Sequence, residues 1–227
     1  MRDLATWWPP TDWFRIVRPD PETDRRRRIF AGIHRHNGWG DAESASGPGS
    51  NLARASLFRA ELEALVRDLG VRSLLDVPCG DFNWLGRFDL DLDRYIGVDI
   101  VPALIAHNRS KFGSRRNRFL VRDMVREPLP RADLIFCRDC LVHFSNAEIF
   151  ATLRNFKRTG STWLLTNSFI EHDENRDIAT GGWQPLNLEA APFALPPPRR
   201  MIDERCLAGG GAYRDKRLAL WRLSDLP

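Results

Sequence analysis

Acidic side chains follow two successive apolar runs in the first half of the chain. The first run, Ser73–Val77, contains Asp76 and leads into a turn with Gly80, and the second, Tyr95–Asp99, ends on a lone carboxylate. Short apolar runs that end in turns are typical of buried strands. Adjacent parallel strands finish at one edge of a sheet, where a nucleoside ligand binds and an acid takes its ribose hydroxyls. We therefore expect Asp99 to accept both hydroxyls, and Gly80, which has no side chain, to let the backbone approach the ligand.

The glycine pattern excludes two common nucleotide sites. Neither G-x-G-x-x-G nor G-x-x-x-x-G-K-[ST] occurs. A D-x-x-C-G-D turn followed by a ribose acid suits an adenosyl ligand without a pyrophosphate, and S-adenosylmethionine is the first candidate. Asp76 would orient the turn or meet the ligand's ammonium through water, Asp81 is a second candidate for the ammonium, and Ile100 would cover one adenine face. The alternative is a plain connection between a strand and a helix.

Five segments together carry a resemblance to a known family. They are SGPGS at 46–50, LLDVPCGDFNW at 74–84, IGVDIV at 96–101, CRDCLVH at 137–143 and TGGWQPLNL at 180–188. With them the chain resembles class I S-adenosylmethionine-dependent methyltransferases, and more narrowly a bacterial subgroup with the LLDxPCGDFNW motif, over roughly residues 30 to 222. Pro78, expected to contact the cofactor, and Phe82 stand where the usual methyltransferase turn has glycines.

The resemblance implies further cofactor contacts. Asp123 matches the position that meets the adenine amino group, and Met124 would offer its backbone N–H to the ring. Arg59 would bind the methionine carboxylate through two parallel hydrogen bonds, with Arg54 as its competitor. Arg138, in the fourth motif, is also expected at the cofactor.

The fourth motif begins where a strand should end, and acceptor chemistry occurs there in this fold. Methyl transfer to a hydroxyl requires alignment of the acceptor and removal of its proton. His143 titrates near neutral pH and is the best candidate for the base, while Asp139 would orient it or act itself. A packing or capping role for His143 is the alternative.

Other polar and aromatic residues are candidate acceptor contacts, because they follow the fifth strand or lie in the Gly-Gly-Trp segment. They are Asn167, Glu171, His172, Trp183 and Asn187. A tryptophan in such a loop can stack on a sugar or a planar ring. Loop anchoring is the other interpretation of Trp183.

Composition limits the remaining possibilities. The 227 residues suffice for one α/β domain, and we expect a cytoplasmic location because the first residues lack the apolar run of a signal peptide. Four cysteines imply no disulfide framework. Cys137-x-x-Cys140-x-x-His143 lacks a second ligand pair for zinc, so no metal is expected. The net charge of +4 comes almost entirely from arginine. The run Arg25–Arg28 is a solvated helix face or a site for an anionic partner.

Alternating apolar segments predict a doubly wound, mostly parallel sheet with a C-terminal antiparallel hairpin. Residues 1–45 are expected to be an aromatic and arginine-rich extension packed on a methyltransferase domain of residues 46–227. The expected helices are 51–69, 102–112 and 146–156. The expected strands are 73–77, 95–99, 119–122, 134–137 and 163–167, with a hairpin of 201–202 and 218–223, and residues 180–198 form an irregular insert.

The leading functional hypothesis is S-adenosylmethionine-dependent methylation of a small-molecule or saccharide acceptor, at oxygen. Nucleic-acid methylation is disfavoured because no N-P-P-[YF]-like motif is present. A nicotinamide oxidoreductase is disfavoured by the missing glycine motif, and a non-catalytic adenosyl-binding protein is the third alternative. We expect neither a membrane nor a nucleic acid as a partner, and the sequence leaves the acceptor, the methylated atom and the oligomeric state open.

Overall fold

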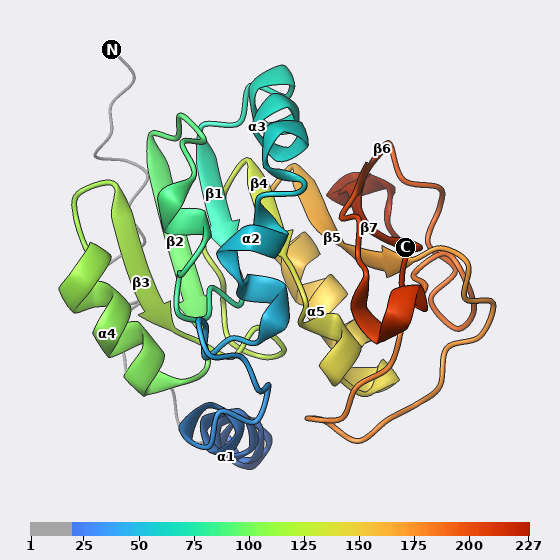
Figure 1. Cartoon of the computed structure of the whole chain (residues 1–227), viewed down its shortest axis with the longest axis horizontal. Coiled ribbons are helices and arrows are strands. Elements are labelled where there is room, and N and C mark those ends of the chain that lie inside the picture. The colour runs from blue at the N-terminus through green and yellow to red at the C-terminus, as the bar shows by residue number, and fades with distance from the viewer. Residues whose placement is uncertain (1–19) are drawn as a thin grey trace.

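A seven-stranded sheet forms the centre of the protein, in a computed structural model that describes residues 20–227 (Figure 1). The strand order is β3-β2-β1-β4-β5-β7-β6, and β7 runs antiparallel to both of its neighbours. The strands are β1 Ser73–Asp76, β2 Arg94–Asp99, β3 Asn117–Val121, β4 Leu134–Cys137, β5 Trp163–Phe169, β6 Arg200–Asp203 and β7 Lys216–Arg222. The predicted doubly wound sheet and its antiparallel C-terminal strands are confirmed.

Helices cover both faces of this sheet. They are α1 Pro21–Arg35, α2 Leu52–Ala55, α3 Arg59–Asp68, α4 Pro102–Phe112 and α5 Asn146–Arg158. Side chains alternate along a strand, so neighbouring residues of β1 enter different cores. Leu75 packs in one core with Ile149 of α5, and Leu74 packs in the other with Leu62 of α3 and Ile105 of α4.

The sequence explains where the helices begin. Ser145 and Glu148 form a reciprocal capping box at the start of α5, and Pro102 occupies the first turn of α4, where its missing N–H costs no hydrogen bond. Both helices start where the sequence predicts. Asp20 caps α1 by accepting a hydrogen bond from the Glu22 N–H at 3.2 Å.

One predicted helix is interrupted in the structure. Residues 51–69 form two helices, α2 and α3, instead of one. The chain leaves helical geometry at Phe58, whose φ is −113°, and the side chain of Phe58 is buried in the core. Packing of this large ring therefore outweighs the continuous helical pattern.

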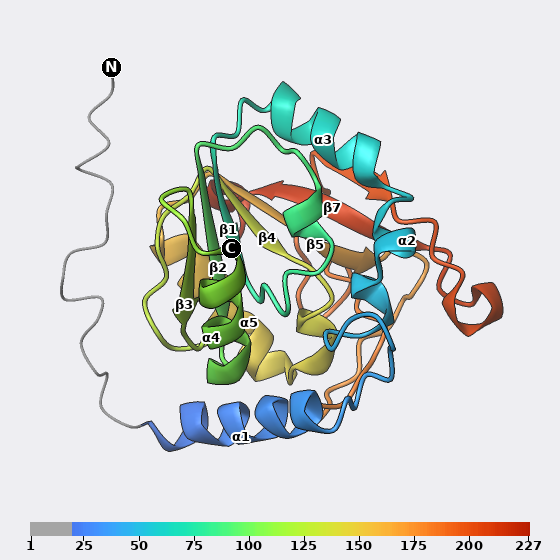
Figure 2. The same ribbon diagram turned by 60° about the vertical axis from the view of Figure 1, so that its left-hand side comes forward.

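Helix α1 lies beyond the ends of the sheet at which β1, β2 and β3 finish, and runs past the ends of α4 and α5 (Figures 1 and 2). Residues 1–19 of the expected N-terminal extension lie outside the described residues, and its division from the rest of the chain stays a prediction. The expected solvated face of Arg25–Arg28 is wrong at Arg26, which is 2% exposed. Among the helices of residues 20–227, none combines the length and apolar character that a bilayer span requires.

Candidate active site

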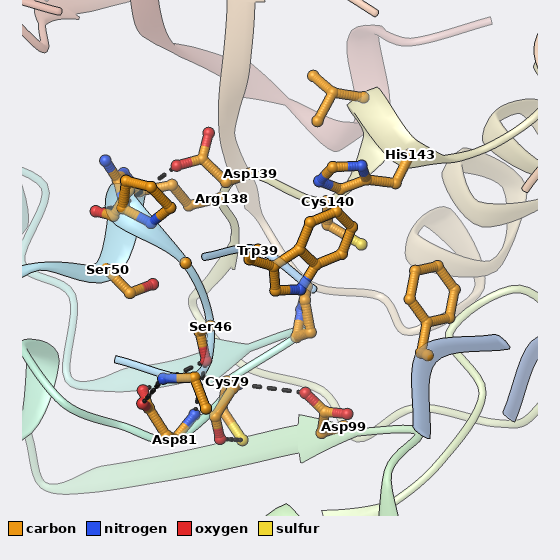
Figure 3. A pocket seen from close by; sticks show the side chains of 18 of the residues that line it. Trp39, Ser46, Ser50, Cys79, Asp81, Asp99, Arg138, Asp139, Cys140 and His143 are labelled. Carbon is orange, nitrogen blue, oxygen red and sulfur yellow. Dashed lines mark hydrogen bonds and ion pairs between the residues drawn. The ribbon is translucent and has the colours of Figure 1, made fainter. Parts of the chain in front are cut away.

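A cavity of about 570 Å³ opens at the carboxyl ends of β1, β2 and β4. Residues at or shortly after the ends of these strands line it, including Gly80, Asp99 and Arg138. Residues 45–50 and the last turn of α1 line another side. Its volume lies within the roughly 300–1,000 Å³ usual for small-molecule sites. Asp99 and Asp81 lie at one end of the view in Figure 3, and Asp139 and His143 lie at the other.

Asp99 is held rigidly at the first end. One carboxylate oxygen accepts the Val101 N–H at 2.8 Å, and the other accepts the Gly80 N–H at 3.2 Å. Each oxygen keeps a further lone pair, so the carboxylate can still accept from both hydroxyls of a vicinal diol. Burial raises the pKa of Asp99 to about 6. The geometry suits the ribose contact that the sequence predicts.

Gly80 must be glycine for two reasons. Its φ of +52° lies in the left-handed region, and a Cβ would collide with the Ser46 hydroxyl. Asn108 donates to the Gly80 carbonyl at 2.8 Å and fixes the turn from the other side. Gly80 therefore presents only backbone atoms to the cavity, and the Ser46 hydroxyl lies against one side of it.

Asp76 lies next to this turn and lines the cavity with Pro78 and Ile100. The Tyr95 hydroxyl donates to its carboxylate at 2.5 Å. Burial raises the pKa of Asp76 to about 7, and the charge of nearby Asp99 acts in the same direction. A cationic ligand group would relieve this unfavourable burial of charge.

Asp81 lines the cavity, but its carboxylate already holds a neighbouring loop. It accepts hydrogen bonds from the Ser44 hydroxyl at 2.8 Å, the Ala45 N–H at 2.9 Å and the Ser46 hydroxyl at 3.2 Å. The dashed line between Asp81 and Ser46 in Figure 3 belongs to this set. Its predicted contact with a ligand ammonium stays a prediction.

Asp123 is similarly engaged. Its buried carboxylate accepts from the Thr23 hydroxyl at 2.7 Å, from Arg26 Nη2 at 2.6 Å and Nε at 3.0 Å, and from the Val125 N–H at 2.9 Å. Four donors occupy this side chain, so it anchors α1. Asp123 and Met124 still line the cavity, and their predicted adenine contacts stay predictions.

The predicted role of Arg59 is wrong. Its side chain is 44% exposed, pairs with Glu63 at 2.7 Å and lies over the ring of Phe88, outside the cavity lining. The competing residue, Arg54, does line the cavity.

Arg138 enters the cavity wall from a buried position. Its guanidinium bonds Glu204 at 2.5 Å and the Gly49 carbonyl at 2.7 Å, and it lies over the rings of Phe58 and Trp84. Several N–H donors of the Arg138 guanidinium group are therefore already engaged. The predicted cofactor contact of Arg138 stays a prediction.

Asp139 does not fit the predicted role of a base. Lys216 Nζ lies 2.5 Å from its carboxylate and Arg138 Nη1 lies 3.3 Å away. These two cations outweigh the effect of burial and hold the pKa of Asp139 well below its usual range. Its φ of +53° is rare for a residue with a side chain, and the Asp139 N–H donates to Asn167 Oδ1 at 2.5 Å. The surrounding structure therefore fixes an ionised carboxylate at the cavity wall.

His143 lies in the 3₁₀ turn Leu141–His143 and lines the cavity. Its Nδ1 is 2.7 Å from the carbonyl oxygen of Gly182. A carbonyl can only accept, so Nδ1 carries the proton and Nε2 keeps a free lone pair. Burial lowers the pKa of His143, so the ring is neutral at pH 7. Gly182, not Asp139, orients the imidazole, and the indole of Trp39 lies 4.2 Å from it between ring centroids (Figure 3).

Four predicted acceptor contacts do not line the cavity: Asn167, Glu171, His172 and Asn187. Asn167 is buried and supports the Asp139 backbone and Glu204. His172 bonds Asp215 at 3.0 Å, and the exposed Glu171 binds the same carboxylate through its N–H. Asn187 fastens its own loop to the His172 carbonyl at 2.8 Å. Three of these side chains therefore hold neighbouring segments together, whereas Glu171 is held only through its backbone N–H.

Trp183 lines the cavity, and the ring of Tyr213 lies 4.9 Å from it. The predicted acceptor contact of Trp183 stays a prediction. Three further aromatic and basic wall residues, Trp39, Tyr213 and Lys216, belong to no motif that marks them in the sequence. Isolated aromatic residues in irregular segments carry no periodic signal.

The cysteines 79, 137 and 140 are buried thiols, and residues 20–227 contain no cluster of three His, Cys, Asp or Glu side chains that could hold a metal ion.

Comparisons with known proteins agree with this architecture. Residues 74–160 match a family model described as "Methyltransferase domain". The comparison with curated protein sequences finds no match.

Several solved structures are similar over part of the chain. The sugar N-methyltransferase KedS8 from Streptoalloteichus sp ATCC 53650 is 25% identical, with a TM-score of 0.44 over 56% of this chain and 55% of that one. Magnesium protoporphyrin IX methyltransferase (ChlM) from Synechocystis PCC 6803 is 13% identical, with a TM-score of 0.48 over 72% and 82%. The chain thus spans about half the length of the first of these proteins. Residues 74–160 are thus similar to a methyltransferase domain.

Proposed function

We propose that the whole chain is an enzyme that transfers the methyl group of S-adenosylmethionine to a hydroxyl of a small-molecule or saccharide acceptor. One observation carries the proposal. A single cavity contains a rigid carboxylate, Asp99, at one end and a neutral imidazole, His143, with a free Nε2 at the other. A nucleoside-binding group and a proton acceptor are the two requirements of methyl transfer to oxygen.

The cofactor end fits an adenosyl group. Asp99 offers two oxygens to a ribose diol, Ile100 offers an apolar surface to the adenine, and the bare backbone of Gly80 accommodates the methionine portion. When bound, S-adenosylmethionine supplies a methyl group on a positively charged sulfur. The buried carboxylate of Asp76 provides a compensating negative charge nearby.

The acceptor end fits a hydroxyl group. The Gly182 carbonyl fixes the tautomer of His143, so Nε2 accepts the acceptor's proton as the new bond to carbon forms. The indole of Trp39 covers the imidazole and limits its access to water. Asp139, ionised and held by Lys216, acts as part of the wall and not as the base.

Calorimetry tests the cofactor assignment. We expect wild type to bind S-adenosylhomocysteine and Asp99→Ala to bind it more weakly by at least ~1.5 kcal/mol, since hydrogen bonds to a charged group contribute roughly 1.5–3 kcal/mol. Asp89→Ala, at an exposed aspartate outside the cavity, is the charge-matched control and should bind as wild type does. Unchanged affinity in Asp99→Ala contradicts the assignment, and binding of NADH instead would favour an oxidoreductase.

Turnover separates an enzyme from a non-catalytic binding protein. S-adenosylhomocysteine should accumulate when the protein is incubated with S-adenosylmethionine and a panel of hydroxyl acceptors, and His143→Ala should reduce its rate of formation. Normal cofactor binding without product from any acceptor in the panel would support a binding protein.

A further inference from the structure

We propose that the acceptor is a neutral planar phenol, whose ring packs against Trp183 and Tyr213 while its hydroxyl lies at Nε2 of His143. The inference rests on the proposed methyltransferase function and narrows its acceptor class. Three observations support the inference. They are the hydrogen bonds that attach the segment around Trp183, the aromatic rings that pack against this side chain, and the pairing of the charged side chains nearby.

Trp183 and His143 belong to one rigid unit. The Gly181 N–H donates to the His143 carbonyl at 2.9 Å, and the Gln184 N–H donates to the Val142 carbonyl at 3.1 Å. The imidazole itself donates to the Gly182 carbonyl at 2.7 Å. Three hydrogen bonds thus fix the segment 181–184 against the residue proposed as the base. A ligand that lies on the indole is thereby held at a set position relative to Nε2.

Aromatic rings dominate this end of the cavity. Trp39, which packs against His143, and the mutually packed Phe169, Trp183 and Tyr213 all belong to the cavity lining. Trp183 and Tyr213 meet edge to face at 4.9 Å, with Phe169 packed behind both at 6.2 Å and 5.9 Å. Trp183 nevertheless remains 45% exposed. An indole held in place from behind, with much of its surface uncovered, is suited to stacking on a planar ligand ring.

The charged side chains near Asp139 in the cavity wall are paired with opposite charges. Lys216 and Arg138 both contact Asp139, at 2.5 Å and 3.3 Å. Both cations also contact Glu204, which balances the second positive charge. A phosphate or carboxylate on the acceptor would have to break these buried pairs, which costs free energy. A neutral acceptor leaves them intact.

Acidity distinguishes a phenol from a sugar. A phenol has a pKa near 10, like the tyrosine side chain, whereas an alkyl hydroxyl is a much weaker acid. His143 is a weak base, because burial lowers its pKa. In the proposed step the phenol oxygen forms a bond to the methyl carbon, and the C–S bond breaks with its electron pair going to sulfur. The phenol proton passes to Nε2, and the products are an aryl methyl ether and S-adenosylhomocysteine.

The test measures acceptor binding and methylation with three probes of related size. They are 2-naphthol, its saturated counterpart decahydro-2-naphthol, and methyl α-D-glucopyranoside. Calorimetry is done with the full chain saturated with S-adenosylhomocysteine, and methylation is followed by chromatography with S-adenosylmethionine. Trp183→Leu and Tyr213→Leu are the variants, and Met201→Ala, an exposed apolar residue outside the cavity, is the control.

We expect 2-naphthol to bind more tightly than both other probes and to be methylated. Trp183→Leu should weaken its binding roughly 3- to 10-fold, the usual range for one aromatic contact, and Met201→Ala should not. Equal 2-naphthol affinity in wild type and in both variants overturns the inference, as does methylation of the glucoside without methylation of 2-naphthol. The second outcome leaves the proposed function intact. Absence of cofactor binding to wild type overturns both.

Discussion

Replacement of Asp76 by asparagine should stabilise the protein in the absence of cofactor. Asp76 is 5% exposed, and burial raises its pKa to about 7 from the ordinary value of 3.8. The folded state therefore disfavours the ionised carboxylate. The stability associated with a neutral Asp76 is complete below pH 3.8 and is lost as the pH rises through 7. Asparagine stays neutral at every pH and can still accept the hydrogen bond from Tyr95.

The pKa difference sets the size of the effect. A shift of about three units corresponds to about 4 kcal/mol at pH 8. We expect Asp76→Asn to raise the free energy of unfolding at pH 8 by about 2–4 kcal/mol, and by less than half as much at pH 5. Because Asp76 is predicted to face the cationic part of the cofactor, the same variant should bind S-adenosylmethionine more weakly than wild type.

Urea unfolding of the cofactor-free protein at pH 5 and pH 8 measures this effect. Asp89→Asn is the control, because Asp89 is exposed and an asparagine there still accepts the Asp91 N–H. The control should stay within about 0.5 kcal/mol of wild type at both pH values. Equal stability of Asp76→Asn and wild type at pH 8, or the same gain at both pH values, would refute the reasoning.

Three further predictions concern the base and the N-terminal segment. His143→Ala should bind cofactor normally but lower kcat by ~10²–10⁴-fold. Because burial lowers the pKa of His143, the wild-type rate at saturating cofactor should fall at acidic pH with a midpoint below pH 6.5, and a midpoint above this pH would contradict the assignment. Arg26→Met leaves the buried carboxylate of Asp123 without its cation, although Glu148 keeps its pair with Arg25, and should destabilise the protein by about 3–5 kcal/mol. Arg27→Met, at a partly exposed pair, should cost less than about 1 kcal/mol. Amide exchange of residues 30–50 should slow when S-adenosylhomocysteine binds, and equal exchange in both states would give this segment a structural role only.

The sequence predicts the regular part of this fold well, because strands β1 to β5 are short apolar runs with clear ends. Strand β4 and helix α4 have the predicted bounds. The sequence does not predict helix α1. Its buried contact is an arginine, Arg26, and not an apolar stripe, so hydrophobic periodicity gives no signal. The break between α2 and α3 is hidden for a related reason, since it depends on where Phe58 finds space in the core.

In the candidate site, too, residues at strand ends can be placed from the sequence and residues in loops cannot. Residues at strand ends, such as Asp99 and Gly80, lie where topology requires, and the cavity forms around them. Side chains in loops cannot be placed by topology. Asn187 and His172 bond to loop atoms, whereas Trp39 and Tyr213, which had no distinguishing motif, form the cavity wall. Only the tertiary structure determines which of two nearby polar groups secures a loop and which faces a ligand.

Hydrogen bonds connect the N-terminal segment to the end of the cavity that is proposed to bind the cofactor. Asp81, after β1, holds the backbone and hydroxyl groups of residues 44–46, and Asp123, after β3, holds α1 through Arg26. Both aspartates line the cavity. A ligand that shifts either aspartate must change the free energy with which residues 20–46 are held. If cofactor binding tightens the hold on this segment, then by thermodynamic reciprocity a looser segment binds the cofactor more weakly. Substitutions in α1, such as Arg26→Met, should therefore change cofactor binding even though Arg26 itself does not line the cavity.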